Sequence, residues 1–559
     1  MRRFGVSQVI LGIAILVLVV FVVYPLSTII HQSFKFEGHL SPVNYWQIVQ
    51  KAANFRALRH SLEVATLSML FATVIGAFLA WLVARTNLPL RGFLRAAFVL
   101  PFIIPPFIGA IAWLQLLGPV GYLNKFYMAL TGSTEPLWNI YGPDGIILVM
   151  ALHSYPLVYL TVLGGLERMN PELEEAAQIS GSPIFAVMKD ITLPLMAPTI
   201  AAGAVLAFIA AIANFGIPAV LGFSARYFVL TTKIYDAVDL GWIGNNLSIA
   251  ACLSIVVSLL AGAGLLLSRL YLKGKEYTTL SGKSMYPNIV QLGIHKYWLL
   301  PLALLVVLIT TVAPVVAIVI TSLTKAYGLP PTPDNLTLDN FKHVLFLLPA
   351  GRRAIRNSLF LAVGAATIVS LLGSLIAYIV VKTKMRFRFV IDFFATMPYS
   401  IPGTVVALAM ILAWIRPLPF TNIVLYNTIW IILIAYVARY LAFGVRTTAG
   451  SLAQIHDSLE EAATISGANW LQAFKDIVIP LIRPGLFASW FLVFMPCLRE
   501  LTISILLWSV GHETIGVLVY NLQDAGDNTG SAALAVVMMT VLMAANFLTR
   551  RLTGGKFGY

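Results

Sequence analysis

Twelve long apolar stretches constrain the fold of this chain more than any other feature of its sequence. A helix needs roughly 20 apolar residues to cross the hydrocarbon core of a bilayer. Stretches of that kind lie at residues 9–30, 60–84, 94–117, 144–166, 196–220, 247–269, 297–322, 357–381, 389–414, 427–446, 484–508 and 532–550. Only 11% of the 559 residues are charged, whereas soluble domains carry about 25%. The composition excludes a soluble enzyme and a coiled coil, and it predicts an all-α polytopic membrane protein with twelve helices.

The basic residues predict how the chain is oriented. The net charge is +14, and Lys and Arg concentrate at 85–95, 269–283, 382–388 and 550–556. Cytoplasmic loops are enriched in Lys and Arg, and all four clusters fall on one side if the N-terminus lies in the cytoplasm. The first apolar stretch is too long for a signal peptide and lacks a cleavage site. We therefore expect an uncleaved first span and both termini in the cytoplasm.

Several kinds of site are excluded by the residues themselves. The two cysteines, Cys252 and Cys497, lie in apolar stretches, which excludes a disulfide scaffold, a thiolate zinc site and an iron–sulfur cluster. A Ser-Gly-Lys-Ser run at 281–284 lacks the earlier glycine and the preceding strand of a phosphate-binding loop. We find neither an ATP site nor a catalytic constellation in the sequence.

The chain consists of two similar halves. Residues 57–62 resemble residues 354–359 at an offset of 297, and the pair Pro101 and Pro105 corresponds to Pro398 and Pro402 at the same offset. Further along, the offset becomes 286. We predict a first six-helix domain at 1–270, a polar cytoplasmic linker at 271–296 and a second six-helix domain at 297–559. Six spans per half make a parallel repeat whose pseudo-two-fold axis follows the membrane normal, with the pathway between the halves.

One cytoplasmic loop in each half carries the same motif. The first loop, at about 170–194, reads Asn-Pro-Glu-Leu-Glu-Glu-Ala-Ala-Gln-Ile-Ser-Gly and later Lys-Asp-Ile-Thr-Leu-Pro. The second loop, at about 456–480, contains Asp-Ser-Leu-Glu-Glu-Ala-Ala-Thr-Ile-Ser-Gly and Lys-Asp-Ile-Val-Ile-Pro. Asn170 is a suitable N-cap, and Asp457 with Glu460 resembles a capping box. Each loop should form a short helix that ends at a glycine with positive φ.

The paired loops resemble the EAA coupling loop of ABC importer permeases, the binding-protein-dependent transport family. The resemblance implies a type I importer fold with both transmembrane halves fused in one chain of a bacterial inner membrane. It implies two partners: two copies of a cytoplasmic ABC ATPase subunit, which use ATP and Mg²⁺, and a periplasmic substrate-binding protein. The chain itself would bind no cofactor and would not be an enzyme. The coupling residues carried over by position are Glu175, Ala176, Ala177, Gly181, Glu461, Ala462, Ala463 and Gly467.

Polar residues late in the fifth span of each half are candidates for the substrate pathway. A charge inside a span costs about 2.5–3.5 kcal/mol on insertion scales, and Arg499 and Glu500 lie late in the stretch 484–508. Asn214 occupies the position of Glu500 in the first half. One interpretation is a polar patch in which Glu500 is an oxygen ligand or counter-ion for a cationic cargo. The other is an anchor at the membrane interface whose charges are satisfied by neighbours.

The cargo is indicated by resemblance alone. Residues 499–508 and 511–516 look like the corresponding segments of fused ferric-iron permeases. Permeases for thiamine and 2-aminoethylphosphonate share the fused plan, so they are the alternatives to ferric iron. A rival of another class is a secondary transporter of twelve spans driven by an ion gradient. Such a carrier has no use for the paired loops, and it would be expected to show titratable groups near the midplane of several spans.

Overall fold

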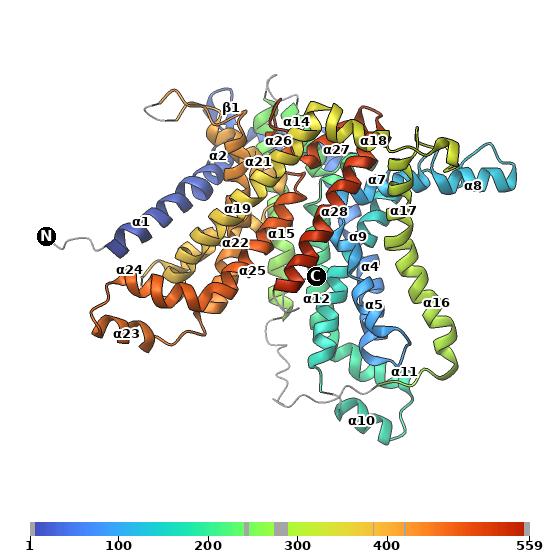
Figure 1. The fold of residues 1–559 in the computed structure, drawn as a ribbon, viewed down its shortest axis with the longest axis horizontal. Helices are drawn as coiled ribbons and strands as arrows, with labels where there is room; N and C mark the ends of the chain where they lie inside the picture. Colours follow the sequence, from blue (N-terminus) through green and yellow to red (C-terminus); the bar gives the residue numbers. More distant parts are fainter. Residues whose placement is uncertain are drawn as a thin grey trace. The chain divides into compact units, whose positions relative to one another are not determined.

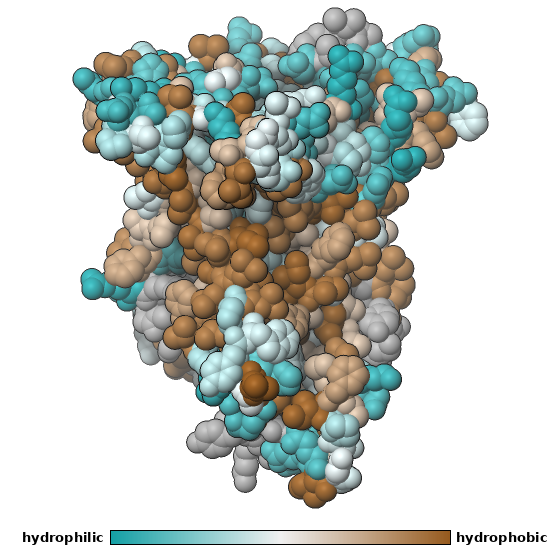
Figure 2. Space-filling model, turned by 90° about the vertical axis from the view of Figure 1, so that its right-hand side faces the viewer, coloured by the Kyte–Doolittle hydropathy of each residue, from teal (hydrophilic) through white to brown (hydrophobic). Residues whose placement is uncertain are grey.

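The computed structural model describes residues 6–170, 172–239, 245–272, 289–383, 385–418 and 421–552. These residues form helices almost throughout (Figure 1), with one small antiparallel hairpin of β1 (Lys35–Phe36) and β2 (His39–Leu40). Among them, eleven helices are long and apolar enough to cross a membrane, or twelve if the bent pair at 388–414 forms one span. On the face in Figure 2, hydrophobic side chains form a band between two more hydrophilic ends. The predicted all-α membrane fold is confirmed.

The chain packs as two compact units, and each is built mainly from one repeat. The first comprises residues 52–232 and 259–337, and the second comprises residues 1–51, 233–258 and 338–558. The helices of residues 52–232 are α4 (Ala52–Arg85), α5 (Arg91–Ala97), α6 (Leu100–Ile103), α7 (Pro106–Leu117), α8 (Tyr122–Thr131), α9 (Pro143–Arg168), α10 (Glu172–Ile179), α11 (Ile184–Val187), η2 (Met188–Thr192), α12 (Leu193–Ile212) and α13 (Gly216–Gly222).

The corresponding helices of the second repeat follow in the same order. They are α18 (Asp339–Lys342), η6 (His343–Leu347), α19 (Pro349–Lys382), α20 (Arg388–Ser400), α21 (Gly403–Trp414), α22 (Ile429–Leu452), α23 (Ser458–Ile465), α24 (Trp470–Ala473), η7 (Phe474–Val478), α25 (Ile479–Leu498), α26 (Ser504–Leu507), α27 (Ile515–Asp524) and α28 (Asn528–Leu552). Two helices, α14 (Leu230–Asp239) and α15 (Asn246–Leu272), each contribute to both units.

The first span of each repeat packs among the helices of the other repeat. The helices α1 (Val6–Leu18), η1 (Val19–Val23), α2 (Tyr24–Ser33) and α3 (Val43–Gln50) lie in the unit of α19–α28. There the ring of Tyr24 meets Trp414 edge-on, with 5.4 Å between centroids. The helices η3 (Gly293–His295), α16 (Lys296–Val307), η4 (Leu308–Val312), α17 (Ala313–Leu323) and η5 (Pro333–Asn335) lie in the unit of α4–α13. In that unit, the Tyr122 hydroxyl and the Thr321 hydroxyl form a hydrogen bond of 2.9 Å.

Most of the predicted linker lies outside the described residues, so the boundary at 271–296 stays a prediction.

Small residues bring the central helices of each unit together. A Cβ on Gly76 of α4 would lie 2.7 Å from the carbonyl oxygen of Tyr155 in α9. A Cβ on Gly373 of α19 would lie 2.7 Å from the backbone of Gly444 in α22. Close backbone approach at small residues is how helices pack in membranes, where burial of apolar side chains supplies little driving force. The two repeats use the same device at the same offset of 297.

The third span of each repeat is broken, which corrects the single helices predicted at 94–117 and 389–414. Ile104 and Ile401 are extended, because the residue before a proline is pushed away from the helical region. Helices α20 and α21 meet at 113° around this break. Arg439 of α22 donates to the carbonyl oxygen of Ile401 at 2.7 Å, which satisfies a backbone group at the break. The breaks immediately before Pro105 and Pro402 thus interrupt both spans at equivalent positions.

Candidate functional site

Both motif loops fold into the predicted short helix with a glycine stop. Figure 1 shows the two short helices, α10 and α23. Each contains eight residues. Gly181 follows α10 with φ of +86°, and Gly467 follows α23 with φ of +88°. Gly181 N–H donates to the carbonyl of Gln178 at 2.9 Å, and Ser182 N–H donates to that of Ala177 at 3.0 Å. This pair of bonds defines a Schellman stop, and φ near +86° is why a glycine is needed.

The second loop repeats this stop in the same register. Gly467 N–H donates to Thr464 and Ala468 N–H donates to Ala463, both at 3.0 Å. After each stop the chain continues into a π-helical segment, η2 or η7, at equivalent positions.

The N-termini of α10 and α23 differ from each other. Asn170 caps α10 as predicted, accepting from Glu172 N–H at 3.0 Å. The predicted box at Asp457 is wrong, since that side chain makes no cap bond; it pairs with Lys382 instead.

The helices α10 and α23, for which the sequence predicts a coupling role and which are called the coupling helices below, expose matching apolar and acidic side chains. Ile179 and Ile465 are each 88% exposed, and Leu173 and its equivalent Leu459 are also exposed. Most of the predicted coupling residues are exposed, whereas the equivalent residues Ala177 and Ala463 are half-buried. Large apolar side chains held on a surface by rigid local structure are typical of a protein interaction site. Each loop therefore presents a candidate docking surface. These two docking surfaces are defined here by Leu173, Glu175, Ala176 and Ile179 and by their equivalents Leu459, Glu461, Ala462 and Ile465.

An ion pair that sequence reasoning missed links α10 to the second span of its repeat, an equivalent pair links α23 to its own, and the first of the two pairs is buried. Arg85 Nη1, at the end of α4, lies 3.8 Å from Glu174 Oε2 in α10, and both side chains are buried. The other oxygen of Glu174 accepts from the Thr192 hydroxyl at 2.6 Å. Glu174 therefore contacts both α4 and η2. The signal was available in the sequence, because Arg85 and Lys382 match at offset 297 while Glu174 and Glu460 match at offset 286.

The second repeat builds the same anchor with different side chains. Lys382 Nζ lies 3.8 Å from Glu460 Oε1 and donates to the carbonyl of Ile455 at 2.6 Å. Tyr378 donates to the second oxygen of Glu460 at 2.7 Å. The carboxylate before each Glu-Ala-Ala motif is thus an anchor toward the span, whereas the motif glutamate faces outward.

The three pathway candidates lie just beyond the ends of the fifth spans, which corrects the predicted stretches 196–220 and 484–508. Helix α12 ends at Ile212 and α25 ends at Leu498. The side-chain oxygen of Asn214 accepts from Ile217 N–H at 3.1 Å, and Glu500 Oε1 accepts from Ile503 N–H at 3.0 Å. Glu500 also accepts a bond from the Tyr440 hydroxyl. Asn214 and Glu500 cap the same chain turn in the two repeats, and Arg499 precedes Glu500 there, half-buried.

Comparison with known proteins identifies the family. The family model described as "binding-protein-dependent transport system inner membrane component" matches the chain twice, at residues 72–272 and 369–554. The chain belongs to this family. Because the two matches fall in the two repeats, this inner membrane component carries both transmembrane halves fused in one chain. As the permease part of an ABC transporter it has no ATPase activity of its own.

Two relatives that align with most of the chain agree with this assignment. The ferric transport system permease protein FbpB of Actinobacillus pleuropneumoniae is 28% identical over 95% of this chain and 76% of its own length. The Fe(3+)-transport system permease protein FbpB 2 of Haemophilus influenzae is 27% identical over 85% of each chain. A bacterial alginate ABC transporter, solved in complex with a periplasmic protein, matches 48% of this chain and 98% of its own chain at 19% identity, with a TM-score of 0.37.

The described part of this inner membrane component holds no group of three or more His, Cys, Asp or Glu side chains arranged to bind a metal ion. Cys252 is buried and donates to the carbonyl oxygen of Ser33 at 3.1 Å. Cys497 is buried in α25.

Proposed function

We propose that this permease imports ferric iron, which it receives from a periplasmic binding protein. Two relatives whose names state ferric transport align with at least 85% of the chain. Alignments of that length reach into both repeats of the chain. Thiamine and 2-aminoethylphosphonate are the alternative cargoes, and a test of iron must include them.

The paired docking surfaces support the proposal that transport is driven by ATP. Two equivalent helices, each with the same stop and a largely exposed motif, suit two copies of one ATPase subunit. Closure of the ATPase dimer would pull on Glu175 and Glu461 and their neighbours. Glu174 bonds Thr192 and lies beside Arg85, so a displacement of α10 reaches both α4 and the segment leading into α12. ATP and Mg²⁺ bind the partner subunits, and this chain needs no cofactor.

The proposed orientation places the docking surfaces and both termini in the cytoplasm. Arg85 pairs with Glu174 of α10, the helix that carries the first docking surface. Arg91 and Arg95 follow Arg85 in the sequence. The positive-inside rule assigns such a cluster to the cytoplasm. Helix α12 starts beside this loop and has 20 residues, so its far end lies about 30 Å away at 1.5 Å per residue. The turn at Asn214 would then be near the periplasmic side.

We further propose that Asn214, Arg499 and Glu500 line the substrate pathway. Each follows the end of a fifth span, at the equivalent turn of its repeat. A single carboxylate that is already hydrogen-bonded offers a cation only weak attraction. Weak binding suits conduction, because an ion held tightly would leave slowly.

The direct test is uptake of labelled ferric iron by cells that lack this gene but express its partners. The wild-type chain should restore uptake, and the double variant Gly181→Asp, Gly467→Asp should not. Equal uptake in the deletion strain and the rescued strain under iron limitation would contradict iron as cargo. Labelled thiamine and 2-aminoethylphosphonate would then be tested in the same strains, and rescue by either would reassign the cargo while keeping the ATP-driven architecture.

A further inference from the structure

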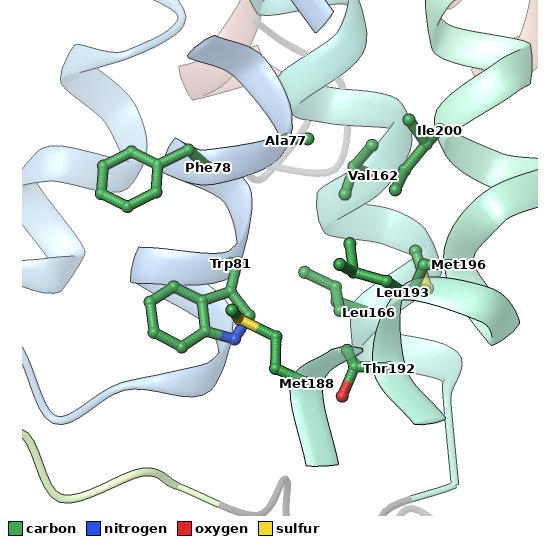
Figure 3. A pocket seen from close by; sticks show the side chains of 10 residues that line it. All are labelled: Ala77, Phe78, Trp81, Val162, Leu166, Met188, Thr192, Leu193, Met196 and Ile200. Carbon is green, nitrogen blue, oxygen red and sulfur yellow. The ribbon is translucent and has the colours of Figure 1, made fainter. Parts of the chain in front are cut away.

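An apolar cavity lies between three long helices and one π-helical segment of the first repeat. Its volume is about 240 Å³, and its lining comes from α4, α9, η2 and α12. Figure 3 shows Phe78 and Trp81 of α4 on one side of it and Val162, Met196 and Ile200 on the other. All three long helices are candidate membrane spans. Water gains no hydrogen-bond partner in such a lining, so a hydrocarbon chain is the occupant that a bilayer can supply.

A basic pocket adjoins this cavity. It has a volume of about 380 Å³ and is lined by Arg91, Arg95 and Glu167, among others. Leu166 lines both spaces, so they are neighbours at the end of α9. Arg95 is paired with Glu167, while Arg91 lies one helical turn away on α5. An apolar space that continues into a pocket with an excess of positive charge has the chemistry of a phospholipid with an anionic head group.

The second repeat places different side chains at most of the equivalent positions. Tyr378, Trp470 and Phe474 stand where Trp81, Ile184 and Met188 stand in the first repeat, and their rings are in mutual contact. The centroid of Tyr378 lies 5.7 Å from that of Trp470 and 5.4 Å from that of Phe474. The equivalent of Arg95 is Asp392, which accepts from Arg446 at 3.0 Å. The lining of the cavity and the charge of the adjoining pocket thus depend on side chains that the second repeat does not share.

We propose that the cavity and the basic pocket together bind one anionic phospholipid, with an acyl chain beside Trp81 and the phosphate at Arg91 and Arg95. Basic pockets between spans on the cytoplasmic side bind acidic head groups in this way. An acyl chain gains little by leaving the bilayer, since lipid tails are as apolar as the lining. Selectivity must therefore come from the head group. The assignment to the cytoplasmic leaflet rests on the orientation proposed above.

The test uses fluorescence quenching by lipids with brominated acyl chains. The full chain is reconstituted in phosphatidylcholine vesicles that contain increasing fractions of brominated phosphatidylglycerol or brominated phosphatidylcholine. The quenching that is lost in Trp81→Phe measures lipid at the cavity. We expect half-maximal quenching at a lower fraction of phosphatidylglycerol than of phosphatidylcholine. Arg91→Gln should weaken this preference by about fivefold, the effect of one cation near an acidic lipid surface.

Two further variants distinguish lipid binding at this site from misfolding and from effects elsewhere in the chain. Glu167→Gln removes the negative charge and frees Arg95, so it should strengthen the preference for phosphatidylglycerol, a result that a merely misfolded protein would not give. Arg388→Gln, at the equivalent of Arg91 in the second repeat, should leave quenching at Trp81 unchanged. Equal quenching by both head groups, or none that depends on Trp81, would overturn the proposal. The assay needs no transport, so failure of the iron proposal would leave its result intact.

Discussion

Arg85 of α4 and Glu174 of α10 form an ion pair in which 2% and 7% of the side-chain surfaces are exposed, with 3.8 Å between Nη1 and Oε2. Glu174 is held on its other side by Thr192. Breaking a buried pair by removing one partner typically costs about 3–5 kcal/mol, because the remaining charge is left without compensation. The pair therefore fixes the position of the first coupling helix relative to the spans, and its loss should affect transmission before it affects the rest of the fold.

The first prediction follows from this pair. Glu174→Gln keeps an oxygen that accepts from Thr192 but leaves the Arg85 charge buried alone. We expect uptake per ATP hydrolysed to fall by about tenfold or more, since 1.4 kcal/mol already corresponds to tenfold. The measurement is the ratio of transport to ATP hydrolysis in vesicles that contain the assembled transporter. Arg85→Lys should retain most of the ratio, because the second repeat uses Lys382 at this position. An unchanged ratio in Glu174→Gln would contradict the anchoring role.

The same change in the second repeat should have a smaller effect. Glu460 is more exposed than Glu174, with 20% of its side-chain surface accessible, and it also accepts from Tyr378. Glu460→Gln should therefore reduce the ratio of uptake to ATP hydrolysis less than Glu174→Gln does. A larger loss in Glu460→Gln would show that burial does not set the strength of the two anchors.

The second prediction concerns the two glycine stops. Gly181 and Gly467 have φ of +86° and +88°, and an added Cβ at either position meets no atom within 4 Å. The penalty for a side chain is thus backbone strain alone, roughly 1–2 kcal/mol per residue. Gly181→Asp combined with Gly467→Asp adds charge to both docking surfaces and should abolish transport while the spans remain inserted. The double Gly→Ala variant carries only the strain, so it should retain partial uptake.

Membrane insertion and uptake are measured on the same cells to separate these effects. Full uptake in the double Gly→Asp variant would rule out a coupling role for the loops. If the Gly→Ala and Gly→Asp variants lose the same fraction of uptake, the turn conformation matters and the added charge does not.

The third prediction separates the two interpretations of Glu500. Glu500 and Asn214 cap equivalent turns, and a glutamine at position 500 keeps the accepting oxygen while removing the charge. If the carboxylate serves a cationic cargo, Glu500→Gln should lower the maximal rate of ferric uptake with normal amounts of protein in the membrane. Asn214→Asp, which adds a carboxylate at the equivalent turn, is the matched control for the cap. Normal uptake in Glu500→Gln would leave this residue as a structural cap only.

The global fold was predictable from sequence because it depends on patterns that two repeats display twice. Span lengths follow from hydropathy, and the stop at Gly181 follows from a motif that recurs at Gly467. The helix breaks were indicated by Pro105 and Pro402, since proline acts on its immediate neighbour. By contrast, the end of α25 at Leu498 lies inside the stretch 484–508, which average hydropathy joins into a single span. Only the side-chain cap from Glu500 to Ile503 N–H marks it, and hydropathy does not register such a bond.

Contacts between distant segments were the part that sequence reasoning missed. Nothing local in the sequence shows that Tyr24 packs on Trp414, 390 positions along the chain, because this contact depends on which bundle the first span joins. The pair of Arg85 and Glu174 was also missed, although comparison of the two repeats would have revealed it. A cation and a carboxylate occur together at the equivalent positions of both repeats. The two repeats of one chain can therefore be compared as two aligned sequences can.

The last prediction concerns the loop between α26 and α27. Glu513 is buried there and accepts from Arg353 Nη2 at 3.2 Å and from Gly511 N–H at 3.0 Å. Burial by itself would raise the pKa of Glu513, but these hydrogen bonds and the charge of Arg353 outweigh it and hold the pKa below its ordinary value. Asn357 of α19 also donates to the carbonyl oxygens of Gly511 and Glu513. The loop is thus attached to the start of α19 mainly through one carboxylate and one amide.

Because the pKa of Glu513 is lowered in the folded protein, its stabilising contribution is present above the ordinary glutamate pKa of about 4.3. It is lost only as the pH falls through the lowered value. Hydrogen exchange of residues 509–514 should therefore stay slow from neutral pH down to about 5 and accelerate in stronger acid, once the intrinsic pH dependence of exchange is subtracted. Glu513→Gln should exchange faster at neutral pH and lose this acid-dependent step. Asp334→Asn, which alters an exposed carboxylate in another loop, should reproduce the wild-type profile. A wild-type profile in Glu513→Gln itself would show that the remaining bonds, from Asn357 and Ser509, attach the loop without the charge of Glu513.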